Sequence, residues 1–394
     1  MSNLRIAIIG AGPGGLTLAR ILQKNGTKCT IFEADENITS RSQGGMLDLH
    51  AETGQLALRE AGLFEAFQKA CRPSAEAMKL VKKDGTVPWD ENKMELPEDL
   101  QRNRPEIDRR DLRNLLLDGI DPEVIQWDKK LDRVEESVST PGEYTLHFSN
   151  GTEAGPFNVV VGADGAWSKV RPLLTDEKPY YSGITIVELH AKEVSTKKQW
   201  LSDYTGAGSC FMFDEGRVLV LQRNADDSIR VYAGVRQPET WVKDCGIDWA
   251  DTMKARQLLT EQYFGDCHED LKRIINVEAT DELTTRALYM LPIGLTWAPR
   301  RGVTLLGDAA HVMTPFAGVG VNIALADALG LAKSLLKGSN LKEAIKEYED
   351  EMFVRAKKNA EKTYKGLKGH FSADGIDQRV AMLNEHAKKL GIRK

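Results

Sequence analysis

Apolar residues along this chain gather in short uninterrupted runs, which is typical of strands buried on both faces of a parallel sheet. The first run covers residues 6–9, a helical pattern follows it as far as Asn25–Gly26, and a second run covers residues 28–32. Two later runs, in "FNVVVGADG" (157–165) and "GVTLLGDAA" (302–310), each reach a glycine with an aspartate close behind. The pattern predicts an α/β fold with a Rossmann-like domain.

Alternating apolar and polar residues occupy the middle of the chain. The alternation is clearest in "GITIVELHAK" (183–192), "RVLVLQR" (217–223) and "SIRVYAGVR", which follows the turn "NADDS". Strands with this pattern have one covered face. We therefore expect a second domain built on a mixed, largely antiparallel sheet.

A long amphipathic helix is predicted near the end of the chain, over residues 341–368. Its apolar residues recur at helical spacing, at positions 341, 345, 348, 352, 356 and 360. Such a face either forms a coiled coil with a partner or packs across both domains of its own chain. We favour packing within the chain and expect a monomer.

Composition narrows the function classes. The chain has 394 residues, enough for two domains, and 53 Lys+Arg against 58 Asp+Glu, a balance that argues against nucleic-acid binding. Its five cysteines include no C-x-x-C pair, and its histidines show no metal-ligand spacing. No apolar run is long enough for a membrane span, and we read no targeting segment, so we expect a cytoplasmic protein without a metal.

The first strand leads into a dinucleotide-binding fingerprint. Gly10, Gly12 and Gly15 form G-x-G-x-x-G between a strand and a helix, and Glu33 ends the next strand. Gly10 permits a tight turn, Gly12 lets the backbone approach a pyrophosphate, and Gly15 allows close packing of helix and strand. Glu33 is placed to accept a hydrogen bond from a ribose hydroxyl, which argues against NADP but does not separate NAD from FAD.

Two aspartates should reach the same place as this fingerprint. Asp164 and Asp308 follow the strands that begin near residues 157 and 302. Ligands of open parallel sheets bind outside the carboxyl ends of the strands. We therefore expect Gly10, Asp164 and Asp308 to lie around one crevice.

Three motifs in this order, "GAGPGG", "GADGAWSKVR" and "LLGDAAHVMTPFAGVGVN", make the chain resemble the class A flavoprotein monooxygenases of the para-hydroxybenzoate hydroxylase type. The segments "SRSQGGMLDLH" and "EIDRRDLRNLLL" look most like the tetracycline-inactivating monooxygenases. The resemblance implies non-covalent FAD, transient reduction by NADPH or NADH, and hydroxylation by O2 through a flavin C4a-hydroperoxide. Because one fingerprint is present and FAD takes it, no second Rossmann unit remains for the nicotinamide cofactor.

The resemblance also implies a division of the chain. The FAD-binding domain should comprise residues 1–71, 102–175 and 278–340, and the substrate-binding domain residues 72–101 and 176–277. Residues 341–394 should form a C-terminal bridging helix and tail.

By the same resemblance, Asp308 hydrogen-bonds the ribityl chain of FAD, and the glycine-rich loop after it approaches the flavin ring with its backbone. Val319 stands where the family often has a polar residue, so contacts there should be backbone only. The residues implied at the cofactor, besides the fingerprint and the two aspartates, are Arg41, Gly45, Asp48, Arg109, Arg113, Gly318, Gly320, Val321 and Asn322. Arg113 matches the family arginine better than Arg109. His311 is expected to brace the loop, and no catalytic base is identified.

The implied substrate is a phenolic or enolic multi-ring molecule, tetracycline-like or an aromatic polyketide, lying between the antiparallel sheet and the loop at Pro315, Phe316 and Gly318. By the resemblance, Glu188, Ser209 and Arg230 occupy the strand positions that correspond to the family's substrate-binding residues. Glu188 and Arg230 either pair with each other, which we favour, or bind substrate, with Arg230 attracting an enolate and Glu188 an amine or hydroxyl.

Two other functions remain open. One is a flavin-dependent reductase of isoprenoid double bonds, which needs no O2. The other is a non-catalytic prenyl-binding escort protein, against which the intact flavin loop argues.

Overall fold

A five-stranded parallel sheet forms the first layer of the molecule. The computed structural model describes residues 4–40, 44–94, 104–338 and 340–389. The sheet has the order β17-β11-β1-β2-β7. These strands are β1 (Ile6–Ile9), β2 (Cys29–Phe32), β7 (Ile125–Gln126), β11 (Val159–Gly162) and β17 (Val303–Leu305). The apolar runs predict four of the five strands, and the Rossmann-like α/β fold is confirmed.

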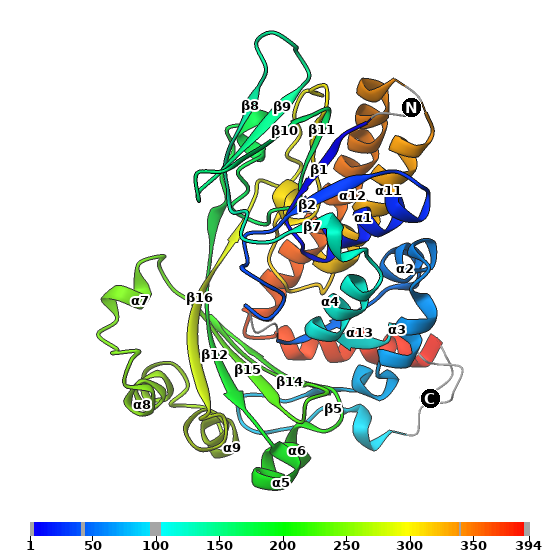
Figure 1. The fold of residues 1–394 in the computed structure, drawn as a ribbon. Helices are drawn as coiled ribbons and strands as arrows, with labels where there is room; N and C mark the ends of the chain where they lie inside the picture. The colour runs from blue at the N-terminus through cyan, green and yellow to red at the C-terminus, as the bar shows by residue number, and fades with distance from the viewer. Residues whose placement is uncertain (1–3, 41–43, 95–103, 339, 390–394) are drawn as a thin grey trace.

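Helices and a short three-stranded sheet lie beside this sheet (Figure 1), and a two-stranded sheet is also present. The helices are α1 (Pro13–Lys24), α2 (Leu56–Ala61), α3 (Phe64–Ala70), α4 (Arg109–Asp118), α10 (Asp308–His311) and α11 (Gly320–Leu336). The short sheets comprise β8 (Leu131–Glu136), β9 (Tyr144–Phe148) and β10 (Glu153–Phe157), and the pair β3 (Met46–Asp48) and β6 (Glu106–Asp108). The sheet and its helices share one apolar core, which contains Ile8, Leu16 and Val160.

A seven-stranded sheet of order β16-β12-β15-β14-β13-β4-β5 forms the second layer. Its strands are β4 (Met78–Leu80), β5 (Trp89–Asp90), β12 (Tyr180–Ala191), β13 (Ser209–Asp214), β14 (Arg217–Arg223), β15 (Ile229–Arg236) and β16 (Glu282–Met290). The outer face carries α5 (Val194–Lys197), α6 (Gln199–Thr205), α7 (Trp241–Asp244), α8 (Thr252–Tyr263) and α9 (Glu269–Arg273). The expected mixed sheet is present, and its alternating segments form β12, β14 and β15.

One expected boundary needs correction. The sequence assigns residues 278–340 to the FAD-binding domain, but β16 pairs antiparallel with β12 along eight residue pairs, so it belongs to the seven-stranded sheet. Its sequence, "ELTTRALYM", lies at the sheet edge and remains largely half-buried, so it lacks the apolar run of a central strand. The division into domains otherwise stays a prediction.

The C-terminal helices join the two layers. Helix α12 (Leu341–His370) is two residues longer than predicted and is followed by α13 (Gly375–Lys389), which the sequence analysis leaves within the tail. Tyr348 and Met352 pack into the core of the parallel sheet, whereas Leu367 packs with Phe371 against the seven-stranded sheet. The helix therefore packs against both layers of its own chain.

No helix in the described part of the chain combines the length and apolar character that crossing a membrane requires. The five cysteines are all free thiols. Among the described residues, no group of three histidine, cysteine or acidic side chains is arranged to hold a metal.

Glu349 fastens α12 to the parallel sheet from a fully buried position. Trp297 Nε1 and Thr304 Oγ1 donate hydrogen bonds of 2.9 and 2.8 Å to its Oε1 atom, while its buried Oε2 atom has no partner. Burial raises the pKa of this carboxyl, because the charged form loses its hydration. A group of this kind stabilises the fold below its unfolded pKa and loses that contribution as pH rises through its folded pKa.

We predict that Glu349→Gln, which keeps the acceptor oxygen and removes the charge, makes the free energy of unfolding less dependent on pH above 4.5, the ordinary pKa of a glutamate. Glu349→Leu should lower that free energy by about 1–3 kcal/mol, since it leaves two buried donors without an acceptor. Urea unfolding of both variants at several pH values measures these effects. An unchanged pH dependence in Glu349→Gln would show that Glu349 is not the group that titrates.

Candidate functional site

The glycine turn after β1 brings three backbones into contact. Gly10 has φ +107°, and a Cβ atom on it would lie 2.4 Å from the carbonyl oxygen of Ala163. A Cβ on Gly15 would lie 2.1 Å from the carbonyl oxygen of Gly10. Helix α1 starts after Gly12, with no side-chain cap and no acidic residue in its first turn. The N-terminal amides are therefore available to an anion such as a pyrophosphate.

Glu33 lies beside this turn, as the fingerprint predicts. The side chain is buried, and its carboxylate accepts hydrogen bonds from the backbone amides of Ala11 at 2.6 Å and Asp35 at 3.0 Å. These bonds fix the carboxylate at the carboxyl end of β2. A contact from Glu33 to a ribose hydroxyl stays a prediction.

Asp164 and Asp308 both follow strands of the parallel sheet at its carboxyl edge. Asp164 accepts a hydrogen bond from the Lys169 amide at 2.7 Å, but its other oxygen is buried without a partner. No described residue hydrogen-bonds the Asp308 carboxylate. The Asp308 side chain is surrounded by protein atoms but remains accessible to solvent. Burial raises the pKa of both carboxyls, while Arg109 and Arg171 act in the opposite direction on Asp308.

Open space borders this edge. Cβ atoms added to Gly12, Gly165 and Gly320 would meet no heavy atom within 4 Å, although these glycines follow three different segments of the chain. Free helix amides, an unpaired carboxylate and an orphaned carboxylate oxygen are the groups that diphosphate and polyol parts of a dinucleotide require. The residues at this edge therefore fit FAD.

Asn322 holds the start of α11 to the segment after β3. Its amide donates to the Asp48 carbonyl at 2.8 Å and its oxygen accepts from the His50 amide at 2.8 Å, so the side chain is already occupied. A Cβ on Gly318 would lie 3.2 Å from the Asp48 carboxylate. The structure thus brings Asp48, Gly318 and Asn322 together, and leaves the backbone of Gly320 and Val321 for a ligand, with Val319 buried.

The two arginines of α4 have different surroundings. Arg113 is buried, donates to the Ile38 carbonyl at 2.8 Å and lies 3.4 Å from Asp35, so it braces the segment after Glu33. Arg109 is exposed and acts electrostatically on Asp308, and its Nε lies 4.0 Å from a Cβ built on Gly45. The structure therefore places Arg109 nearer the open edge. Arg41 lies outside the described residues.

His311 braces the loop, as expected. Its Nε2 atom contacts the Asp327 carboxylate at 2.5 Å, and Asp327 also accepts from the Gly307 amide at 3.0 Å and from Arg355 at 2.9 Å. The buried Asp327 carboxylate raises the pKa of His311, outweighing the desolvation that lowers it. The same pair, again against desolvation, lowers the pKa of Asp327. This buried network holds the turn that presents Asp308.

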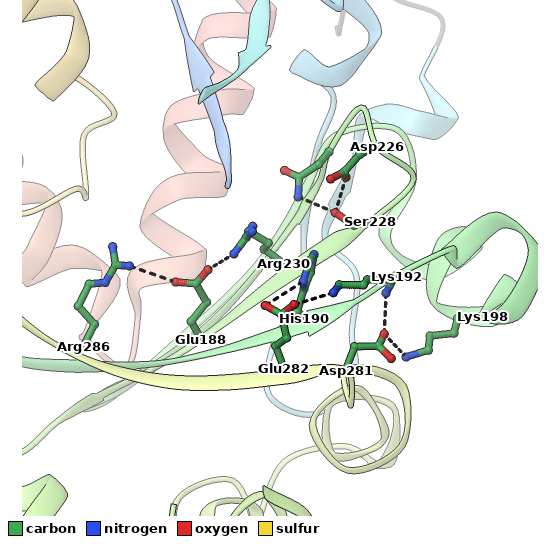
Figure 2. A network of polar contacts seen from close by, with 11 residues as sticks. Glu188, His190, Lys192, Lys198, Asp226, Ser228, Arg230, Asp281, Glu282 and Arg286 are labelled. Atoms are coloured by element: carbon green, nitrogen blue, oxygen red, sulfur yellow. Dashed lines mark hydrogen bonds and ion pairs between the residues drawn. The ribbon is translucent and has the colours of Figure 1, made fainter. Parts of the chain in front are cut away.

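Glu188 and Arg230 pair with each other, so the favoured alternative is the one in the structure. Arg286 approaches the other carboxylate oxygen of Glu188 at 3.8 Å, and Figure 2 shows Glu188 between the two arginines. Phe316 packs edge-on against Phe371, with 5.4 Å between ring centroids. The loop at Pro315 and Phe316 therefore contacts the C-terminal helices as well as facing the sheet.

Two residues near this face are absent from the sequence prediction. A Cβ built on Gly45 would lie 2.9 Å from the Tyr232 hydroxyl and 3.7 Å from Gln222 Oε1. Tyr232 is two residues beyond Arg230 on the same strand, so strand alternation is the signal that could have identified it. The alternation cannot show that Gly45, from a distant segment of the chain, packs against the Tyr232 hydroxyl.

Comparisons with known proteins agree with this site. A model of a family described as the FAD binding domain matches residues 3–363. The chain is 30% identical to the monooxygenase asqM of Emericella nidulans, over 97% of this chain and 99% of that protein. It is 29% identical to the monooxygenase penA of Penicillium thymicola, over 96% of this chain and 98% of that protein.

Solved structures share the fold. HpxO of Klebsiella pneumoniae, solved with FAD and uric acid, has a TM-score of 0.78 at 21% identity, covering 99% of this chain and 95% of its own. The tetracycline destructase Tet(55) has a TM-score of 0.73 at 17% identity, covering 98% of this chain and 95% of its own. Both likenesses extend over both layers and the C-terminal helices.

Asp308→Ala should reduce the fraction of purified protein that carries FAD. Removing the carboxylate leaves ribityl hydroxyls unpaired, at a cost of about 1–3 kcal/mol in FAD binding. Flavin absorbance per protein and titration of the apoprotein with FAD measure the change. Asp308→Asn, which keeps an acceptor oxygen, should lose less affinity, and equal losses in the two variants would contradict the ribityl contact.

FAD retention should weaken as pH rises above neutrality. The pKa of His311 is raised in the folded protein, so protonated His311 stabilises the loop at low pH. This stabilisation is lost as the pH rises through the folded pKa of His311. Since the pKa of Asp327 is lowered, its contribution is lost only at acid pH. His311→Gln should flatten the alkaline part of this dependence. The exposed His386, changed to glutamine, is the matched control and should leave the profile of FAD release unaltered.

Proposed function

The chain belongs to the FAD-binding domain family and is an FAD-dependent monooxygenase, and on that premise we propose that it hydroxylates a phenolic or enolic multi-ring substrate at the expense of NADPH or NADH. The carboxyl edge with Gly12, Asp164 and Asp308 carries the proposal, because its free amides and unpaired carboxylate oxygens fit one dinucleotide. When bound and reduced, FAD activates O2 for transfer of one oxygen atom.

The protein would bind and orient both partners. The first turn of α11 presents backbone N–H groups at Gly320 and Val321, which would stabilise negative charge on a bound flavin. Asn322 fixes that helix against the segment after β3 through two hydrogen bonds. Apolar side chains around Phe316 and Phe371 would exclude water from the reacting atoms.

The seven-stranded sheet supports the proposed substrate class. Its face toward the FAD-binding domain combines apolar residues such as Ile186 and Val220 with the neutralised pair Glu188–Arg230. A flat molecule with polar groups on its rim suits such a surface better than a highly charged one. HpxO was solved with uric acid and Tet(55) is a tetracycline destructase, and we propose a flat polycyclic substrate here, tetracycline-like or an aromatic polyketide.

The nicotinamide cofactor would bind only transiently. The one G-x-G-x-x-G turn of the sequence opens α1. We also propose a cytoplasmic monomer, since the cysteines are free and the apolar face of α12 is covered by the chain itself.

The FAD-loaded enzyme should consume O2 and NADPH faster when a phenolic or enolic substrate is added, and the product should gain one oxygen atom. Tetracycline and a set of aromatic polyketides, tested by oxygen electrode and mass spectrometry, measure this. Reduction of an isoprenoid double bond under nitrogen would instead support the reductase alternative. No turnover of any kind by a fully flavinylated protein would favour the escort alternative.

A further inference from the structure

Four polar side chains share one face of the seven-stranded sheet. In the pairing of β12 with β15, Glu188 lies opposite Tyr232, and in the pairing of β14 with β15, Gln222 lies opposite Arg230. Residues directly opposite each other in an antiparallel pair point to the same face. Gly44 and Gly45 lie against this face, since Cβ atoms on them would meet Arg230, Tyr232 and Gln222.

The charged members of this set are paired with each other. Glu188 pairs with Arg230, and both side chains are nearly buried, at 13% and 14% exposure. The Arg230 guanidinium also packs directly on Gly44, because a Cβ there would lie within 2.1 Å of it. Separating a pair in this setting leaves an uncompensated charge. The Glu188–Arg230 pair is therefore a structural part of this sheet face and is not available to a ligand.

The neutral members are available. Among the described residues, neither the Tyr232 hydroxyl nor the Gln222 side chain has a hydrogen-bond partner. Burial, with the neighbouring Glu188, raises the pKa of Tyr232 to about 12, so its hydroxyl remains a donor at physiological pH. Oε1 of Gln222 points to the same glycine and is an acceptor. One donor and one acceptor thus converge beside Gly45.

We propose that Tyr232 and Gln222 bind a cyclic amide of the substrate, with the Tyr232 hydroxyl donating to its carbonyl oxygen and Gln222 Oε1 accepting from its N–H. A cyclic amide carries these two groups on adjacent atoms with the complementary polarity. A carboxylate offers no N–H for the Gln222 oxygen to accept. This inference rests on the proposed function and narrows its substrate class to lactam-containing ring systems.

Two probes of the same shape separate the two hydrogen bonds. In 7-hydroxy-2-quinolone the ring carries C=O and N–H, and in 7-hydroxycoumarin an ether oxygen replaces the N–H. Binding to the FAD-loaded enzyme is followed by the change in flavin absorbance. We expect the wild-type protein to bind the lactam about tenfold more tightly, the ratio that one net hydrogen bond gives.

Each variant has its own expected signature. Gln222→Met should weaken the lactam alone by about tenfold and so abolish the preference, whereas Tyr232→Phe should weaken both probes by about tenfold and keep the ratio. Tyr180→Phe, at an exposed tyrosine of β12, is the matched control and should change neither affinity. Flavin content and melting temperature equal to wild type establish that each variant is folded.

Equal binding of the two probes by the wild-type enzyme would overturn the inference, as would a lactam preference that survives in Gln222→Met. In either case stimulated NADPH oxidation with other phenols would leave the proposed function standing. If neither probe binds, the lactam site is refuted. Failure of every phenol to bind or to stimulate oxidation would refute the proposed function as well.

Discussion

The direct contact of backbones at Gly10 and Gly15 is the constraint on which the rest of the site depends. Any Cβ atom at these positions would overlap a carbonyl oxygen, at 2.4 and 2.1 Å. Because the backbones touch, β1, α1 and the end of β11 have fixed separations. This contact sets where the helix amides, Asp164 and Asp308 stand relative to one another, although the two aspartates are 144 residues apart.

Ionised and neutral polar side chains have different roles around this backbone contact. Several buried ions are tied in structural pairs, such as His311 with Asp327 and Glu188 with Arg230, whereas Glu349 is held by two neutral donors. The groups that remain open to ligands are backbone N–H groups, a hydroxyl and a side-chain amide. Asp308 at the carboxyl edge is the main charged group that also remains open. Ionised side chains that are paired within the protein keep the site in one arrangement. Neutral polar groups can exchange a bound water for a ligand at a small cost in free energy.

Much of the fold could be predicted because its signals are local. The runs and alternations at residues 6–9, 217–223 and 228–236 coincide with β1, β14 and β15 to within a residue. Strand β16 was assigned to the wrong domain because an edge strand with threonines and an arginine has no strong period. Helix α13 follows a short turn and packs on a sheet far away in sequence, which no local pattern reports.

The site shows the same limit. Glycines and strand-end aspartates could be placed because the fold dictates where they converge. The roles of Arg109 and Arg113 could not be separated from the sequence, since four residues along one helix share nearly the same direction. Tyr232 and Gln222 become interesting only through Gly45, a residue of the other layer, so their significance exists in the tertiary structure alone.

The position of β17 at the sheet edge also affects how the protein is made. Strand β1 leaves the ribosome well before β17, so its neighbour β11 can gain its outer partner only after residue 303 has emerged, and α12 follows later still. At about 5–20 residues per second, roughly 300 residues take some tens of seconds. During that interval the nascent chain holds an incomplete flavin site with an open sheet edge. FAD can therefore meet a complete site only after β17 and α12 have emerged.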